Sequence, residues 1–166
     1  MLDVGHLIEL AEREAKSQGP GKPRQANLRR SASTAYYTLF HHLLATTAVT
    51  FVAAADWKSR VLFYRALDHG QARKRCRALG QSVLAAPEKT FFGFNYFSVG
   101  LRDFANEFVR LQELRHSCDY DPEFVISKQQ VQDAIADVRA AITKLDNAYA
   151  TQRRQFLSYL LLGIRT

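Results

Sequence analysis

Residues 25–52 read QANLRRSASTAYYTLFHHLLATTAVTFV, and the spacing of their apolar side chains predicts one long amphipathic helix. At 100° per residue these side chains fill one wide arc of the helix surface. The arc consists of Leu28, Ala32, Ala35, Tyr36, Leu39, Phe40, Leu43 and Leu44. A face this wide has to be covered by other helices, so the stretch predicts the central helix of an all-α protein.

Helical periodicity continues along most of the remaining chain, and no segment alternates as a strand would. Further helices are expected over residues 3–18, 57–79, 98–118 and 151–163, and another is opened by a capping box of Ser127 and Gln130. The helix over 98–118 has to end before Pro122. The pattern predicts a single domain over residues 1–166, an up-and-down bundle of four to five main helices with short accessory helices.

Several local details of this bundle can be predicted as well. Glycine and proline in residues 17–23 should break the first helix, and Gly70 is a weak point inside the helix over 57–79. That helix is expected to bury Trp57, Val61 and Tyr64. Residues 85–97 are expected to be irregular, and five of their side chains are aromatic. The aromatic loop 91–97 is interpreted as a core plug or an oligomer contact, with base stacking as the alternative.

Composition narrows the class of protein. Hydrophobic residues make up 47% and charged residues 23% of the 166-residue chain, which is typical of a globular domain. No apolar stretch is long enough for a membrane span, and acids stand near the N-terminus where a signal peptide carries bases. We therefore expect a cytoplasmic protein without membrane contact. The two cysteines, Cys76 and Cys118, cannot by themselves form a disulfide framework or a four-ligand zinc site. No cofactor is expected, because the phosphate-binding and dinucleotide-binding motifs do not occur.

The positive charge is concentrated in one part of the chain. The net charge is +7, yet residues 22–77 alone carry eleven bases and two acids. The predicted nucleic-acid-binding residues of this segment are Arg30, Arg65, Arg73, Lys74, Arg75 and Arg77. The alternative is a solvated helix face that the charge keeps soluble.

A polar group interrupts the apolar face of the helix over 98–118. Gln112, Arg115 and Asp119 lie in the same arc as its buried side chains, and Arg115 and Asp119 have the spacing of a helical ion pair. His116 lies beside this arc. The group is either a structural ion pair that finishes the helix, or an anion-binding or acid–base cluster at the end of the bundle.

Histidines elsewhere give two weaker candidates. On the helix over 25–52, Arg30, Thr34, Tyr37 and His41 form a stripe at the border of the apolar arc. His41 is therefore a candidate acid–base group or a hydrogen-bonded packing residue. Arg65, His69 and Cys76 also share one helix face, but their spacing matches no recognised metal site. No metal is expected.

Two motifs together resemble the HEPN-domain proteins. They are LRRSASTAYYTLFH over residues 28–41 and LQELRHSCDYDP over residues 111–122. Trp57 and the stretch RALDHG over residues 65–70 are similar to the same branch of that family. The resemblance implies a helical bundle that forms a homodimer. It also implies either a metal-independent ribonuclease of a toxin–antitoxin or defence system, or a non-catalytic nucleic-acid or nucleotide-binding module that partners an antitoxin, a toxin or a nucleotidyltransferase.

The family's ribonuclease motif is an arginine, a polar residue, three variable positions and a histidine. Carried onto this chain, the arginine is Arg115 and the polar residue is His116, while the histidine position holds Tyr120. Arginine suits the phosphate and histidine suits proton transfer, whereas an unperturbed tyrosine is a poor base at pH 7. The candidate catalytic residues are Arg115, His116, Asp119, Tyr120 and His41. Two hypotheses follow: an RNA-directed protein with ribonuclease chemistry, or an interaction module in which the arginine–aspartate pair is structural.

Overall fold

The computed structural model describes residues 3–16, 21 and 24–164 of the chain, and over this part it is all-α, as predicted. The helices are α1 (Val4–Glu14), α2 (Gln25–Phe51), α3 (Trp57–Arg65), α4 (His69–Leu79), α5 (Ala86–Phe92), α6 (Val99–Tyr120), α7 (Lys128–Asp146) and α8 (Ala150–Leu162). None of these helices is both long and apolar enough to cross a membrane.

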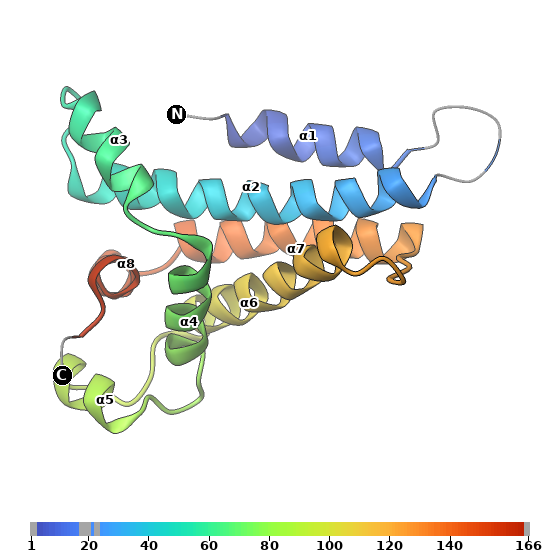
Figure 1. Cartoon of the computed structure of the whole chain (residues 1–166). Coiled ribbons are helices and arrows are strands. Elements are labelled where there is room, and N and C mark those ends of the chain that lie inside the picture. Colours follow the sequence, from blue (N-terminus) through green and yellow to red (C-terminus); the bar gives the residue numbers. More distant parts are fainter. Residues whose placement is uncertain (1–2, 17–20, 22–23, 165–166) are drawn as a thin grey trace.

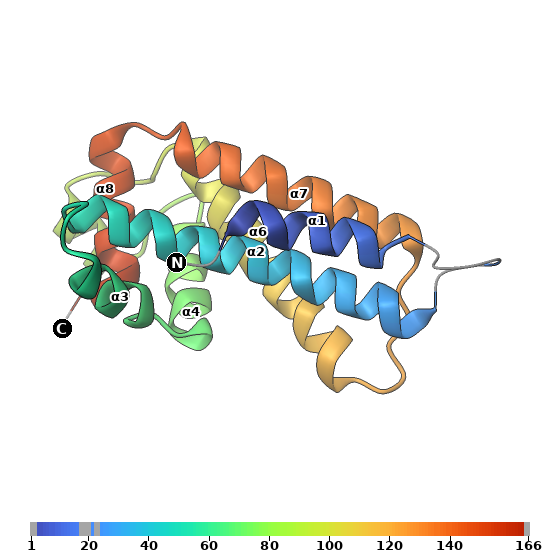
Figure 2. The same cartoon turned by 90° about the horizontal axis from the view of Figure 1, so that it is seen from above.

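Four helices form the body of the molecule. α1, α2, α6 and α7 lie side by side, and α2 contacts each of the other three (Figures 1 and 2). α1 and α6 run antiparallel to α2 and α7, which is the expected up-and-down arrangement. The shorter helices α3, α4, α5 and α8 gather toward the end of the bundle where α2 ends. This leaves the last turn of α6 at the opposite end, beside the first turns of α2.

The apolar arc predicted for residues 25–52 is buried along its whole length. Leu28, Ala32, Ala35, Tyr36, Leu39, Phe40, Leu43 and Leu44 are all at most 5% exposed. Phe108 of α6 packs against Tyr36 and Phe40, with ring centroids 5.6 and 6.3 Å apart. Burial of apolar area on this scale is the main force that holds the helices together. The central position of α2 follows from its sequence.

The prediction of one continuous helix over residues 57–79 is wrong, because the chain forms two helices there. α3 ends at Arg65 and α4 begins at His69, and Gly70 lies inside the first turn of α4. The break lies at Asp68, whose carboxylate accepts a hydrogen bond from the backbone N–H of Gln71 and so caps α4.

The prediction that Trp57 is buried is also wrong. α3 contributes no fully buried residue, and Trp57 is 65% exposed. Val61 and Tyr64 are half-buried. α3 packs on the bundle as a peripheral helix, and the bundle core is complete without it.

Residues 85–97 are not wholly irregular. Pro87 lies in the first turn of α5, where a proline loses no hydrogen bond, and Gly93 ends the helix with a φ of 75°. The predicted core plug is confirmed for Phe97, which is fully buried against Phe92 and Phe156. Phe91 remains exposed.

The other boundaries follow the sequence. α1 ends at Glu14, and most of the predicted break over residues 17–23 lies outside the described residues. α6 continues to Tyr120 and ends before Pro122, and Ser127 and Gln130 form the predicted capping box of α7.

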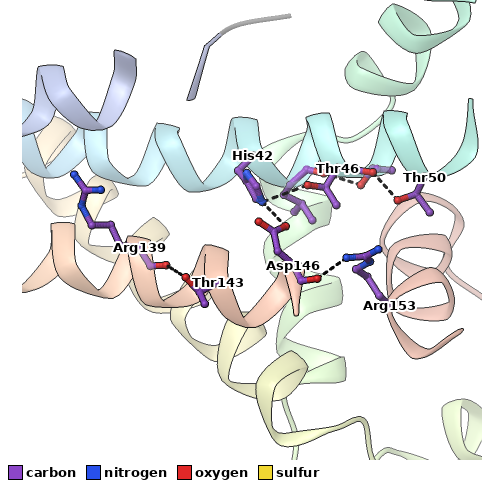
Figure 3. Close-up of polar contacts among 9 residues, drawn as sticks. His42, Thr46, Thr50, Arg139, Thr143, Asp146 and Arg153 are labelled. Atoms are coloured by element: carbon purple, nitrogen blue, oxygen red, sulfur yellow. Dashed lines mark hydrogen bonds and ion pairs between the residues drawn. The ribbon is translucent and has the colours of Figure 1, made fainter. Parts of the chain in front are cut away.

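Polar contacts join α2, α7 and α8 at the end where α3 and α8 lie. The His42 imidazole is 2.9 Å from a carboxylate oxygen of Asp146, and Arg153 donates to the backbone carbonyl of Asp146 (Figure 3). These contacts fix the C-terminal end of α7. His42 therefore has a structural environment that is separate from the last turns of α6.

Candidate functional site

Arg115, in the last turns of α6, is held by three side chains. Its Nε atom is 2.6 Å from a carboxylate oxygen of Asp119, which confirms the predicted ion pair. Its Nη2 atom donates to the Tyr37 hydroxyl at 2.9 Å and to the Tyr120 hydroxyl at 3.4 Å. The guanidinium also lies 5.4 and 5.2 Å from the centroids of these two rings. Such contacts fix the orientation of an arginine and favour its charged form.

The cluster bridges two helices. The Ser33 hydroxyl of α2 donates to the second carboxylate oxygen of Asp119 at 2.6 Å. Asp119 therefore connects α2 to Arg115. Ser33 is a site residue that the sequence interpretation did not include, and Tyr37 was placed only in the stripe with His41, since the contacts of both residues depend on how α2 packs against α6.

The guanidinium keeps its charge and remains accessible. Burial lowers the pKa of Arg115, but the hydrogen bond with Tyr120 and the nearby Tyr37 and Asp119 together raise it by more. The net result is a pKa above the ordinary arginine value. The Arg115 side chain is 17% exposed, and its Nη1 atom has no hydrogen-bond partner among the described residues. An arginine with one nitrogen free at the surface can receive an anion there.

His116 and Tyr120 lie at the outer side of the cluster. Their ring centroids are 5.0 Å apart, and both residues are exposed. His116 is thus beside Arg115 in sequence and in contact with the tyrosine that touches the guanidinium. Arg110, which also lies on α6, is held by Glu107 and Asp137 and is not part of this cluster.

A groove of about 720 Å³ adjoins the cluster between α2 and the end of α6. Its walls are formed by Gln25, Ala26, Arg29, Arg30, Ser33, Thr34, Tyr37, Cys118 and Asp119. Arg30 is exposed and its Nε atom is 2.8 Å from a carboxylate oxygen of Glu14. The groove therefore combines two arginines of the basic segment with Tyr37 and Asp119, two of the three residues that hold Arg115.

Arg29 caps the C-terminal end of α6. Its Nε and Nη2 atoms donate to the backbone carbonyls of Cys118 and Asp121, each at 2.6 Å. The last carbonyls of a helix lack partners within the helix, and a cation there is favourable. Arg29 thus positions the turn that carries Asp119 and Tyr120.

Arg29→Ala is expected to lower the free energy of unfolding by about 2 kcal/mol, because two carbonyls lose a charged donor. Amide hydrogen exchange should quicken from Cys118 to Asp121 more than in the rest of α6. Chemical denaturation and exchange mass spectrometry measure the two effects. Arg29→Lys, which keeps the charge, should recover part of the loss; equal exchange in wild type and Arg29→Ala would contradict the capping role.

Two histidines lie close to the ring of Tyr37. The His69 Nδ1 atom is 2.8 Å from the Tyr36 hydroxyl, and the His41 Nδ1 atom is hydrogen-bonded to the Tyr64 hydroxyl. Burial lowers the pKa of His41. Burial, then the charge of Arg115 and then His41 lower the pKa of His69, against a smaller opposite effect of Asp68. In both cases the shift favours the neutral imidazole over the imidazolium.

The basic cluster on α4 is divided between structural and free cations. Arg75 donates to the backbone carbonyls of Leu160 and Leu161, and so it caps the end of α8 instead of facing solvent. Arg77 pairs with Glu113 of α6 at 2.8 Å. Lys74 and Arg65 are exposed and Arg73 is half-buried. None of these residues lines the groove beside Arg115.

The cysteines have no reactive environment. Cys76 and Cys118 are both buried and free, and burial raises the pKa of Cys118 to about 11. Among the residues that the structure describes, no three His, Cys, Asp or Glu side chains lie close enough together to hold a metal ion.

Comparison of the chain with protein-family models, with characterised proteins and with solved structures gave no match.

Proposed function

We propose that this protein binds RNA, that Arg115 contacts a backbone phosphate, and that the bound strand is cleaved without a metal ion. The observation that carries the proposal is the state of Arg115: charged, oriented by Asp119 and two tyrosine hydroxyls, and open at Nη1. A guanidinium that is already oriented loses little freedom when it binds a phosphate, and its planar fork matches the phosphate oxygens.

The surroundings of Arg115 favour a nucleic acid over a small anion. Arg30 lines the groove with a largely exposed side chain, although its Nε atom pairs with Glu14, and the exposed Tyr120 ring can stack on a base. Arg65 and Lys74 lie in the same basic segment and are free to meet a long polyanion. The resemblance to HEPN-domain proteins supports the same class of ligand.

Cleavage without a metal uses the strand's own 2′-hydroxyl. The 2′-oxygen attacks the adjacent phosphorus, its proton passes to a base, and the 5′-oxygen leaves with a proton from an acid. The products are a 2′,3′-cyclic phosphate and a free 5′-hydroxyl. Arg115 is suited to stabilise the extra negative charge on phosphorus, and the exposed His116 is the adjacent group able to transfer a proton near pH 7.

A second candidate function is RNA binding without cleavage. One observation favours it: Tyr120 occupies the position at which the HEPN ribonuclease motif has a histidine, and its hydroxyl contacts Arg115. In this case Arg115 still binds phosphate, and the cluster holds a strand for a partner such as a toxin, an antitoxin or a nucleotidyltransferase. The same resemblance leads us to expect a homodimer, which light scattering on the purified protein measures.

The two candidates are separated by incubating the protein with end-labelled single-stranded RNA in EDTA. Fragments that end in a 2′,3′-cyclic phosphate, lost in His116→Ala and kept in Arg110→Ala, support cleavage with His116 as a proton-transfer group. Arg110 is a matched control, since it lies on α6 and is engaged by Glu107 and Asp137. Binding without fragments supports the second candidate. If the protein neither binds nor cleaves the RNA, both candidate functions are refuted.

A further inference from the structure

The ring of Tyr37 is in contact with both Arg115 and His69. The Arg115 guanidinium carbon is 5.4 Å from its centroid, and the His69 ring meets it edge-on with centroids 5.7 Å apart. The two side chains come from α6 and from the first residue of α4. Arg115 is also close enough for its charge to lower the pKa of His69. The cation and the imidazole are thus neighbours, although they are far apart in sequence.

The position of His69 is fixed from several sides. Its ring stacks on Phe40 with centroids 3.8 Å apart, and its backbone carbonyl accepts a hydrogen bond from the buried Gln112 at 2.9 Å. Asp68 caps the helix that His69 begins. An imidazole held by stacking, by a backbone contact and by a ring-nitrogen contact has a defined direction.

The hydrogen bond with Tyr36 determines which nitrogen of His69 carries the proton. Tyr36 is fully buried, and its hydroxyl has no partner other than His69 Nδ1 among the described residues. A buried hydroxyl that does not donate leaves an unsatisfied proton, which is unfavourable. Tyr36 therefore donates to Nδ1, and the neutral imidazole carries its proton on Nε2.

The Nε2–H group of His69 is available to a ligand. In the part of the chain that the structure describes, Nε2 has no hydrogen-bond partner, and it is not among the buried polar atoms that lack one. It is therefore open to solvent. A neutral N–H donor beside a fixed guanidinium adds a hydrogen bond to an anion without repelling the cation.

We infer that His69, as a neutral donor through Nε2, forms a second phosphate contact beside Arg115, so that a nucleic-acid backbone lies across Tyr37 and touches both residues. This inference rests on the proposed function, because it extends the site of Arg115. It assigns to His69 a role in binding the RNA backbone, separate from the proton transfer proposed for His116.

Two substitutions of His69 separate a binding role from a packing role. Asparagine places a polar atom near Nδ1 and keeps the Tyr36 contact, whereas glutamine places an N–H donor near Nε2 and loses that contact. We expect His69→Asn to weaken binding of a 2′-O-methyl uridine oligomer about tenfold, and His69→Gln to weaken it by less than about threefold. A purely structural role predicts the reverse order. Fluorescence anisotropy measures the affinities, and thermal unfolding shows that each variant is folded.

Imidazole NMR gives a readout that does not depend on a variant. The free protein should show His69 as the Nε2–H form at pH 7. The titratable and charged groups that face it are Tyr36, Tyr37 and His41 from α2, Arg115 from α6 and Asp68 at its own cap. Addition of the oligomer should raise the pKa of His69, since a nearby phosphate favours the imidazolium.

The outcomes are distinguishable. His42→Asn is the control, because His42 lies in the second half of α2 and pairs there with Asp146 of α7 (Figure 3). The RNA affinity of this variant should equal that of the wild type. Binding that requires Arg115 but is unchanged in His69→Asn, with an unchanged His69 spectrum, overturns the inference and leaves the proposed function intact. Absence of any binding by the wild-type protein overturns both.

Discussion

Arg115→Ala is expected to abolish RNA cleavage and to weaken RNA binding by at least about tenfold. The substitution removes the fixed cation at the centre of the cluster, and loss of one such group in a charged transition state reduces a rate by about 10²- to 10³-fold. It also removes the donor to Tyr37 and leaves Asp119 with Ser33 as its remaining partner. The free energy of unfolding should therefore fall by about 1–2 kcal/mol, a loss that leaves the protein folded.

The control for this experiment is a second substitution at the same position. Arg115→Lys keeps the charge but loses the planar fork, so binding should recover partly and cleavage much less. RNA affinity, single-turnover cleavage and urea denaturation on the same preparations separate the chemical effect from the structural one. An Arg115→Ala protein with wild-type affinity would exclude Arg115 as a phosphate ligand.

Phe108→Ala is expected to have the largest effect on stability, a loss of about 3–5 kcal/mol in the free energy of unfolding. Phe108 is fully buried, and its ring contacts Tyr36, Phe40 and Phe104. Removing the ring leaves a cavity next to Tyr36 and Phe40, the two rings against which His69 packs. Urea denaturation measures the loss.

The matched variant is Phe108→Leu, which keeps most of the buried volume and should lose much less stability. Phe91→Ala is a surface control, because Phe91 is largely exposed and should change stability little. A loss below about 1 kcal/mol in Phe108→Ala would contradict the packing described for α2 and α6.

The fold was largely predictable because its signals are local. The apolar arc of residues 25–52, the capping box at Ser127 and the stop before Pro122 each depend on residues within a few turns of one another. The errors have local causes too. Asp68 favours the start of a new helix, and this signal outweighs the tendency of Gly70 to break one. Pro87 and Gly93 mark the start and the end of the short helix α5.

The site was predictable only where its residues share a helix. Arg115 and Asp119 are four positions apart, so their pairing follows from helical geometry. Ser33, Tyr37 and Arg29 join them through the packing of α2 on α6, which periodicity does not specify. Arg75 belongs to a stretch of basic residues that the sequence predicts to be exposed. In the structure α8 packs beside it, and Arg75 caps the C-terminal end of that helix.

The central claim, that RNA lies on the Arg115 cluster, is tested most directly by photo-crosslinking. A 4-thiouridine RNA is bound to the wild-type protein, irradiated and digested, and the modified residues are identified by mass spectrometry. We predict crosslinks at Tyr37, His116 or Tyr120, which surround Arg115, and their loss in Arg115→Ala. Crosslinks confined to surfaces away from α6 and the first half of α2, unchanged by that substitution, would contradict it.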